Sequence, residues 1–380
     1  MINTKKKIKV LHVLHAVGGV DIYLRLLIET INHDKFEYII IKGIDDNDKP
    51  YFTPDGKPIK LYALHINREI NLLNDLKVIS QVVGIFKKEK PNIIHAHSAK
   101  GGIIARMASV FYKVNVLHTP HAYSYLSTNN KFKRKIFLLI ESFFSKLNSY
   151  LLATSNSEIQ RGIKDVGYKE NKTILFNNSV LPIKNKGINL AKINLPKEYI
   201  CTVGRPSYQK NIEMMVEVIK RVKQTKPDIH LVLMGVGEYS PNKEKVNQLI
   251  KQYNLQKNIT LVKWMEREKI LEIIAKSKLY ISTSRYEGLP YSIIESLSLA
   301  KSCIVTNCDG NRDLVKDGYN GFLINNFDEN AMSKKICKVL NDDSLRHELE
   351  KHSLELFNKE FNLENNISKL ETIYDRLKLN

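Results

Sequence analysis

Short apolar runs alternate with amphipathic segments along almost the whole chain. Strands of a parallel sheet give such runs because they are covered on both faces, and the crossover helices that join them give the amphipathic segments. The pattern predicts strands in the first half of the chain at Ile8–His15, Phe36–Ile41, Ile59–Leu64, Ile93–Ala96, Val114–Thr119, Leu151–Thr154 and Thr173–Asn177. It predicts strands in the second half at Tyr199–Val203, Ile229–Met234, Ile259–Val262, Leu279–Ser282, Cys303–Thr306 and Phe322–Ile324.

The periodicity fails between Asn178 and Lys197, where prolines and asparagines indicate a linker. We therefore predict an α/β protein with two doubly wound, Rossmann-like domains that face each other across a cleft. Its parts are an N-terminal domain of residues 1–180, a linker of residues 181–197, a C-terminal domain of residues 198–343, and two helices in residues 344–380 that pack back toward the N-terminal domain. Ligands of such sheets bind beyond the carboxyl ends of the strands, so the motifs that follow strands are the candidates for a site.

The chain is basic, with 59 Lys and Arg against 40 Asp and Glu and a formal net charge of +19. Phosphorylated ligands, anionic lipid and nucleic acid are the partners that such an excess suits. Glu141 is the only acidic residue between residues 100 and 150, so the first domain contains a basic segment. Nucleic-acid binding is disfavoured, because basic residues interleaved with stacking aromatic residues along a recognition element are missing.

Cysteine usage and the start of the chain both suit the cytosol. The cysteines at 201, 303, 308 and 337 lie in or beside apolar stretches without C-x-x-C spacing, which is typical of buried reduced thiols. The basic and apolar start, Lys5 to Val20, resembles a signal peptide but contains histidines and no small-residue cleavage pattern, so we interpret it as the first strand and turn. Because no apolar run is long enough to span a membrane, we expect a cytoplasmic protein.

Two turns between a strand and a helix are candidate phosphate sites. At Gly18-Gly19 the backbone amides and the helix N-terminus are able to approach a phosphate. A Gly-Gly turn needs no ligand, however, and the full G-x-G-x-x-G pattern is missing. Gly204-Arg205 ends a strand and Lys210 follows at the start of the next helix, where the helix dipole adds positive potential. The alternative for these two cations is a solvated surface pair.

The segment SRYEGLPYSIIE, residues 284–295, contains two carboxylates in a strand-loop-helix context. Glu287 lies in the loop, and Pro290 suits the first turn of the helix that follows. Glu295 lies among apolar residues, where an unpaired carboxylate is costly, so we expect it to have a hydrogen-bonding partner such as ligand hydroxyls. The alternative role of Glu287 is to stabilise the N-terminus of that helix.

Two groups of residues resemble metal ligands, and we favour a structural role for both. His95 and His97 share a face at a strand end, but no Cys, Asp or Glu close by in sequence completes a site. Asp46-Asn47-Asp48 has the D-x-D spacing of a manganese or magnesium site, but it lies in a stretch typical of a polar turn. We expect no metal and no cofactor. Taken alone, His121 is typical of an ordinary loop histidine.

Residues 131–147 predict a basic amphipathic helix. Its cations are Lys131, Lys133, Arg134 and Lys135. An apolar stripe at helical spacing is typical of a helix that packs on its sheet, and it consists of Phe132, Ile136, Leu139, Ile140, Phe143 and Leu147. Three further residues, Phe137, Leu138 and Phe144, widen the apolar surface beyond that stripe. We therefore expect this helix to dock reversibly on an anionic membrane surface.

Together these residues resemble glycosyltransferase family 4, a group of retaining enzymes with the GT-B fold. The resemblance covers nearly the whole chain. It rests on Gly18-Gly19, NIIHAHSAKGGIIAR at 92–106, HTPHAY at 118–123, VGRPSYQK at 203–210, the E-x7-E pair of Glu287 and Glu295, and GNRDLVKDGYNGFLI at 310–324. The sequence departs from the family where a common E-G-F-G-L-P loop is shortened to E-G-L-P, and where Lys301 replaces a frequent glycine.

The resemblance implies roles for the candidate residues. His121 and Glu287 would be catalytic and lie beside the transferred sugar. The donor-binding set would be Gly18, Gly19, Arg205, Lys210, Glu287, Gly288, Leu289 and Glu295. Within that set, Arg205 and Lys210 would hold the donor diphosphate and Glu295 would bind the ribose.

The resemblance also implies the reaction: retaining, metal-independent transfer of a sugar from a nucleoside-diphosphate donor, such as a UDP-sugar, to a saccharide acceptor. A lipid-linked acceptor would place the enzyme at the inner face of a bacterial membrane, in the synthesis of a surface polysaccharide such as lipopolysaccharide, O-antigen or capsule. The first alternative is a nucleotide-sugar epimerase or hydrolase with the same donor site. The second is a non-enzymatic nucleic-acid-binding protein, for which only the net charge argues.

Overall fold

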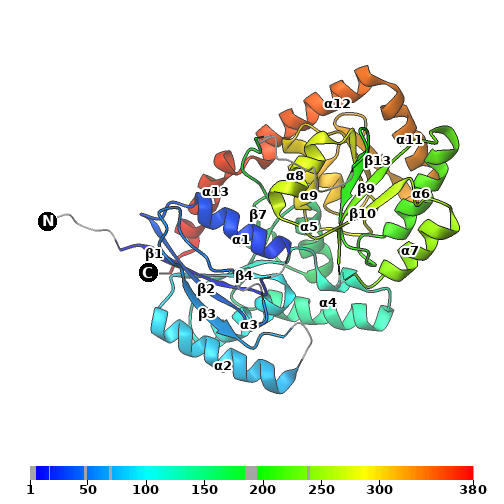
Figure 1. Cartoon of the computed structure of the whole chain (residues 1–380). Helices are drawn as coiled ribbons and strands as arrows, with labels where there is room; N and C mark the ends of the chain where they lie inside the picture. Colours follow the sequence, from blue (N-terminus) through cyan, green and yellow to red (C-terminus); the bar gives the residue numbers. More distant parts are fainter. Residues whose placement is uncertain are drawn as a thin grey trace. The chain divides into compact units, whose positions relative to one another are not determined.

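The computed structural model describes residues 6–16, 18–46, 49–67, 71–184, 195–237 and 240–379. The chain forms two compact units, which are Met1–Asn178 with Leu363–Asn380 (unit 1) and Ser179–Asn362 (unit 2) (Figure 1). Each unit is a parallel sheet flanked by helices, which confirms the predicted class of two doubly wound α/β domains. Most of the predicted linker, residues 185–194, lies outside the described residues.

The two closing helices belong to different units. Helix α13 (Leu363–Leu377) is grouped with unit 1, where it packs on α1 (Gly19–Thr30). Helix α12 (Asp343–Leu356) belongs to unit 2 and contributes Leu349 to the core of that unit. The division at Asn362 therefore differs from the predicted one, because the apolar face of α12 is buried in the second core.

Unit 1 has a seven-stranded parallel sheet in the order β3-β2-β1-β4-β5-β6-β7. Its strands are β1 (Ile8–Val13), β2 (Phe36–Gly43), β3 (Lys60–Leu64), β4 (Ile93–His97), β5 (Val116–Thr119), β6 (Ser149–Ala153) and β7 (Thr173–Leu175). All the strands predicted in this half are present, with ends that shift by up to two residues. The strand order reverses between β1 and β4, which pair in the register Val10↔Ile93.

Helices cover both faces of this sheet. The longer ones besides α1 and α13 are α2 (Leu72–Glu89), α3 (Ser98–Phe111) and α4 (Lys131–Ser145), and a short helix α5 (Asn156–Arg161) follows β6. Buried residues of α2 and α3, such as Val82 and Ile104, pack with Leu11 and Ile94 of the sheet. Helix α3 contacts both α2 and α4, so it lies between them in one layer.

Unit 2 repeats the plan with a six-stranded parallel sheet in the order β10-β9-β8-β11-β12-β13. Its strands are β8 (Ile200–Val203), β9 (Leu231–Val236), β10 (Ile259–Lys263), β11 (Leu279–Ser282), β12 (Cys303–Thr306) and β13 (Gly321–Ile324). Its helices are α6 (Ile212–Thr225), α7 (Lys243–Gln252), α8 (Arg267–Lys276), α9 (Tyr291–Ser298), α10 (Asn311–Leu314), α11 (Glu329–Asn341) and α12. The order again reverses beside the first strand, between β8 and β11.

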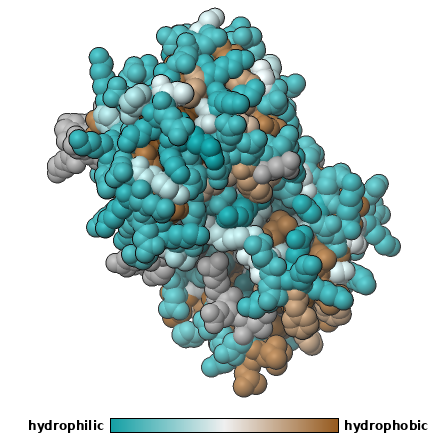
Figure 2. All heavy atoms as spheres, turned by 90° about the vertical axis from the view of Figure 1, so that its right-hand side faces the viewer, coloured by the Kyte–Doolittle hydropathy of each residue, from teal (hydrophilic) through white to brown (hydrophobic). Residues whose placement is uncertain are grey.

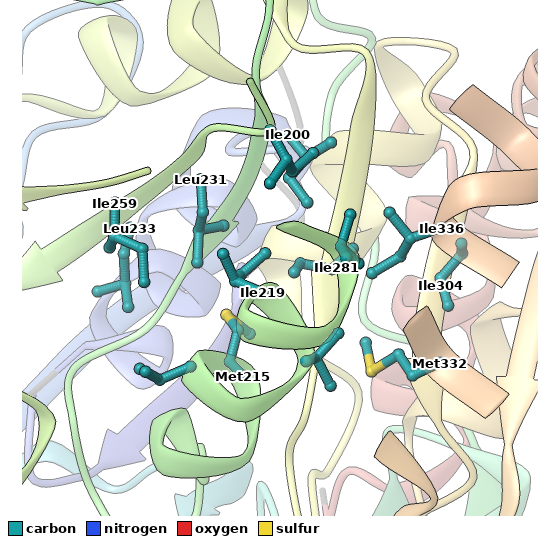
Figure 3. Close-up of a cluster of buried hydrophobic side chains, with 14 of the residues drawn as sticks. Ile200, Met215, Ile219, Leu231, Leu233, Ile259, Ile281, Ile304, Met332 and Ile336 are labelled. Carbon is teal, nitrogen blue, oxygen red and sulfur yellow. The ribbon is translucent and has the colours of Figure 1, made fainter. Parts of the chain in front are cut away.

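The core of unit 2 lies between its sheet and the helices α6 and α11. Figure 3 shows Met215 and Ile219 of α6 and Met332 and Ile336 of α11 gathered against strand residues such as Ile281. Every one of these side chains is buried. This packing fixes the sheet, and hence the loops at the carboxyl ends of its strands, where the candidate site lies.

Candidate active site

Two of the charged residues predicted in the second half, Lys210 and Glu287, meet at the carboxyl ends of β8 and β11. These strands flank the reversal of strand order, which is where ligands bind in such sheets. Lys210 precedes α6, and Glu287 lies in the loop after β11. Lys210 Nζ donates a hydrogen bond of 2.7 Å to Glu287 Oε1. The fold thus joins two predicted site residues in one ion pair.

Glu287 is held by two further side chains. Ser284 Oγ donates to its Oε1 at 2.7 Å, and Gln209 Nε2 donates to its Oε2 at 3.0 Å. None of these three contacts involves an amide of α9, so they do not make Glu287 a cap of that helix. An ionised carboxylate offers about four lone-pair positions, so one position is left for a ligand hydroxyl.

Both predicted cations lie at one turn. Arg205 is exposed directly after Gly204 at the end of β8. A Cβ atom on Gly204 would lie 3.1 Å from Cγ and Cδ of Lys210, so the glycine makes room for the Lys210 side chain to cross the strand end. The turn therefore presents two positive charges before the N-terminus of α6, an arrangement suited to a phosphate.

Glu295 is buried on α9, and its expected partner is a protein side chain. Arg267 Nε, on the first residue of α8, donates to Glu295 Oε1 at 2.7 Å. Burial raises the pKa of the Glu295 carboxyl, and the Arg267 guanidinium opposes that shift. Gly288 and Leu289 are buried in the loop before α9, and Pro290 is the N-cap residue of the helix.

The glycine turn of unit 1 is anchored by Asp46. Gly18 has a φ of 59° and is the N-cap of α1, which begins at Gly19. Asp46 Oδ2 accepts hydrogen bonds from the backbone N–H groups of Ala16, at 2.5 Å, and Gly43, at 2.9 Å. The other carboxylate oxygen of Asp46 contacts Nδ1 of His15.

These contacts give Asp46 a structural role in the loop that leads into α1. Oδ2 accepts both backbone hydrogen bonds, whereas Oδ1 only contacts the His15 ring. Asn47 and Asp48 lie outside the described residues.

His121 lies on a strained turn after β5. His121 and Ala122 have φ values of 54° and 84°, and consecutive left-handed residues other than glycine are costly. The Ala122 N–H donates to Glu158 Oε1 at 2.9 Å, which holds the turn. The His121 ring is partly exposed and contacts the Tyr23 ring edge-on at 5.0 Å between centroids. Burial of its surroundings lowers the pKa of His121 to about 3, so the imidazole is neutral at physiological pH.

His95 and His97 are fully buried beneath this turn. His95 Nδ1 is 2.7 Å from the Tyr374 hydroxyl and Nε2 is 2.9 Å from Thr119 Oγ1. Among the described residues, one ring nitrogen from each of His12, His95 and His97 lies within 4.8 Å of the others. Burial lowers the pKa of all three imidazoles, so they too are neutral.

The buried face of helix α4 is not the one that the sequence predicted. Phe132, Leu139 and Phe143 of the predicted packing stripe are 73%, 60% and 60% exposed. The residues interpreted as surplus face inward instead, since Phe144 is buried and Phe137 and Leu138 pack on a small core cluster. The buried pair of Arg106 and Glu141 explains this rotation, because the only acidic residue of α4 must face Arg106.

Sequence reasoning missed several partners of the site residues. Gln209 adjoins Lys210 in the predicted motif, but nothing local marks it as a partner of Glu287. Arg267 is 28 positions from Glu295, on another helix. Ser284 and the pair of His15 and Asp46 were likewise not assigned. Apart from Ser284, which lies three residues before Glu287, these contacts join segments that are distant in the sequence and that only the fold brings together.

Two Rossmann-like sheets, one with a cation-and-carboxylate cluster at its switch point, define the class of GT-B glycosyltransferases. The structure of sucrose-phosphate synthase from Thermosynechococcus elongatus has this fold, with a TM-score of 0.83 and 20% sequence identity over 98% of this chain and 99% of that chain. The model of the family described as Glycosyltransferase Family 4 matches residues 17–180, and that of Glycosyl transferases group 1 matches residues 186–355. The two models together match most of the chain, which therefore belongs to the glycosyltransferases of family 4 (group 1).

Characterised relatives are similar over most of their length. The UDP-Gal:alpha-D-GlcNAc-diphosphoundecaprenol alpha-1,3-galactosyltransferase of Escherichia coli is 29% identical, over 98% of this chain and 98% of that protein. The capsular polysaccharide biosynthesis glycosyltransferase CapM of Staphylococcus aureus is 25% identical, over 85% of this chain and 88% of that protein. Within the described residues, no helix combines the length and the apolar character that crossing a membrane requires.

Proposed function

We propose that this glycosyltransferase moves a sugar from a UDP-sugar to a lipid-linked saccharide, with retention of anomeric configuration and without a metal ion, in bacterial surface-polysaccharide synthesis. The observation that carries the proposal is the cluster of Arg205, Lys210 and Glu287 at the switch point of unit 2. It provides fixed cations for a diphosphate beside a carboxylate for sugar hydroxyls. The relative from Escherichia coli is named for a UDP-sugar donor and a diphosphoundecaprenol acceptor, which supports both substrate classes.

The charge changes of the reaction explain why two cations suit it. The bond between the anomeric carbon and the β-phosphate oxygen breaks, and negative charge grows on the diphosphate. Arg205 and Lys210 would stabilise that charge, as a metal ion does in other transferases. The acceptor hydroxyl oxygen bonds to the same face of the anomeric carbon and its proton passes to the departing phosphate oxygen, so we assign no protein nucleophile.

Glu287 would recognise the donor sugar through its remaining lone-pair position. Its three protein hydrogen bonds fix the carboxylate before the donor binds, so little ordering is needed on binding. Glu295 would take the ribose hydroxyls while Arg267 keeps its buried charge compensated. Gly288 and Leu289 would offer backbone groups of the same loop, and Gly18 and Gly19 of unit 1 would approach the diphosphate.

We further propose that α4 docks on the inner face of an anionic membrane. Phe132, Ile136, Leu139 and Phe143 are spaced i, i+4, i+7 and i+11 and form one exposed apolar face. Lys131, Lys133, Arg134 and Lys135 are exposed beside it, and the only acid of the helix is neutralised inside by Arg106. An apolar face and cations that are both exposed match anionic lipid in both respects.

A second apolar group lies on the same layer of helices. Leu72, Leu73 and Leu76, at the start of α2, are 75%, 83% and 60% exposed. In Figure 2, apolar side chains gather in the lower part of the view, at the heights that α4 and the right-hand end of α2 have in Figure 1. Helices α2 and α4 both follow strands of the parallel sheet of unit 1, so the leucines at the start of α2 and Phe132 at the start of α4 lie toward the same edge of the sheet and would reach the headgroup region together.

The proposed reaction is tested with a panel of nucleotide sugars scored for release of the nucleotide. Slow hydrolysis of the donor requires no knowledge of the acceptor, so at least one UDP-sugar should give UDP above the background without enzyme. The initial rate should be unchanged by EDTA. A rate that EDTA abolishes and Mn²⁺ restores would contradict metal independence, and release from non-UDP donors alone would contradict the choice of nucleotide.

A further inference from the structure

Three imidazoles form one hydrogen-bonded chain that ends at His121. His12 Nδ1 lies 3.0 Å from His97 Nε2, and His97 Nδ1 lies 3.3 Å from His121 Nε2. The ring planes of His12 and His97 differ by 7°, and those of His97 and His121 by 22°. The ring centroids are 5.3 Å and 5.5 Å apart, so the rings meet edge to edge and each nitrogen lone pair can point at its neighbour, as a hydrogen bond requires.

These nitrogens are better explained by hydrogen bonds than by a metal ion. Both ring nitrogens of His95 and both of His97 already have hydrogen-bonding partners. The group of His12, His95 and His97 contains no carboxylate. A divalent ion would displace those bonds and bring two uncompensated charges into a fully buried region.

Proton counting leaves two arrangements for the chain. Each neutral imidazole has one N–H and one acceptor nitrogen. In the first arrangement, His12 Nδ1 donates to His97 and His97 Nδ1 donates to His121 Nε2, so the proton of His121 is on Nδ1. In the second, every bond is reversed and the N–H of His12 lies on Nε2.

Burial of His12 distinguishes the two arrangements. His12 is fully buried, and among the described residues its Nε2 has no hydrogen-bonding partner. The second arrangement would leave an N–H group buried without an acceptor, and orphaned N–H groups are the rarer kind in proteins. The first arrangement leaves only an unused acceptor and is therefore favoured.

We propose that His12 and His97 are positioning residues that keep the proton of His121 on Nδ1, so that His121 acts as a hydrogen-bond donor to a substrate oxygen. The inference rests on the proposed function for the identity of that oxygen, which belongs to the donor sugar or to its phosphate. A fixed Nδ1–H excludes His121 as the base that removes the proton of the acceptor hydroxyl. The strained turn at His121 and Ala122 fits this role, because Glu158 holds it in one conformation.

The tautomer itself is measurable without substrate. Long-range ¹H–¹⁵N correlation spectra of protein labelled with ¹⁵N-histidine distinguish the two neutral tautomers, and His121→Asn assigns the signal by its disappearance. We expect the Nδ1–H form in the wild-type protein. An Nε2–H form for His121, or one bound equivalent of zinc in metal analysis of the purified protein, would overturn the inference.

Variants separate positioning from folding. His97→Leu breaks the chain and should mix the His121 tautomers and lower kcat by about tenfold, the value of one hydrogen bond, with affinity for UDP unchanged. His97→Gln keeps a donor and an acceptor and should retain most of the activity. His95→Gln perturbs the same buried cluster but leaves the chain intact, so its His121 spectrum should match the wild type.

Two outcomes of the variants contradict the inference. One is a wild-type tautomer of His121 in folded His97→Leu, because the chain would then not set it. The other is an equal loss of kcat in His95→Gln and His97→Leu, which would mean that the cluster acts only through the fold. Because the spectra need no substrate, a protein inactive toward every nucleotide sugar would still test the chain.

Discussion

At the residue scale, the candidate donor site depends on the ion pair of Lys210 and Glu287. We propose that Lys210 binds the diphosphate and that Glu287 binds the sugar. Lys210 is bound to Glu287, so a diphosphate that draws Lys210 toward itself would loosen its hold on the carboxylate. Gln209 and Ser284 still hold Glu287 in that case. Diphosphate binding and sugar recognition are thereby coupled through a single charged hydrogen bond.

Removing either cation should therefore slow the reaction strongly. We expect Arg205→Ala and Lys210→Ala to lower turnover by roughly 10² or more, as the loss of a preorganised group that stabilises the leaving charge does. The measurement is the rate of UDP release by folded variants. Lys245→Ala, an exposed lysine on α7, is the matched control and should be as active as the wild type. Near-normal turnover in both test variants would rule out their role.

Substitutions of Glu287 and Glu295 should have different effects on the binding of UDP and of the UDP-sugar. Glu287→Gln removes the charge that faces the sugar, so we expect it to weaken use of the UDP-sugar more than binding of free UDP. Glu295→Ala removes the proposed ribose contact and leaves Arg267 unpaired, so it should weaken binding of both. Titration calorimetry with UDP and with the UDP-sugar provides the comparison. Equal losses of UDP affinity in the two variants would contradict the assignment.

At the element scale, the strands were predictable and the orientation of α4 was not. Parallel strands produce short apolar runs whatever their neighbours are, so a local pattern is enough to predict them. All the predicted strands are present, with ends displaced by up to two residues. Helix α4 is amphipathic, but the centre of its apolar face, at Phe132, Leu139 and Phe143, is exposed, so its periodicity alone points to the wrong side as the buried one. The buried pair of Arg106 and Glu141 decides it, and that pair joins residues 35 positions apart.

The same reasoning applies to the site itself. Motif residues at strand ends were predictable because topology alone brings strand ends together. Gln209 and Arg267, the partners of Glu287 and Glu295, come from other segments of the chain, and no local pattern specifies such pairs. The histidine chain was hidden for the same reason, since His12 lies 85 positions from His97.

Helix α4 should bind lipid through both its charges and its apolar face. We expect the protein to co-sediment with anionic vesicles and to be released by high salt. Each nearby cation adds on the order of 1 kcal/mol, so Gln at Lys131, Lys133, Arg134 and Lys135 should weaken binding by 10² or more. Ser at Phe132, Leu139 and Phe143 should also weaken it without loss of stability, because these side chains are exposed.

A charge-matched variant controls for net charge. Gln at Lys243, Lys245, Lys251 and Lys257 removes four exposed cations from unit 2 and should leave lipid binding unchanged. Sedimentation that is indifferent to lipid charge, or that falls equally in both four-residue variants, would show that α4 is not the docking element.

At the scale of the whole molecule, buried neutral histidines should make the protein sensitive to mild acid. Burial lowers the pKa of His12 to about 3, and it lowers those of His95, His97 and His118 as well. The unfolded chain takes up protons at these sites near pH 6.5, whereas the native chain does not. Their contribution to stability is therefore present above pH 6.5 and is lost as the pH falls toward 3.

The free energy of unfolding should accordingly decrease below pH 6.5, measured by urea titration at several pH values. Each such histidine adds up to about 1.4 kcal/mol per pH unit to the slope. His95→Gln removes one of these sites, so it should flatten the dependence by about that amount. A free energy of unfolding that is constant between pH 7.5 and pH 5 would contradict the burial of these rings in neutral form.

Glycosyl transfer itself is tested most directly by following the sugar. A UDP-sugar labelled in the sugar is incubated with wild-type protein and a bacterial lipid extract, and the label is traced in the organic phase. Because UDP-hexoses are α-linked, we predict a labelled lipid product that an α-glycosidase cleaves and that folded Lys210→Ala forms about 100-fold more slowly. Label that remains in an altered nucleotide sugar, or appears only as free sugar whether or not the extract is present, would contradict the assignment as a transferase.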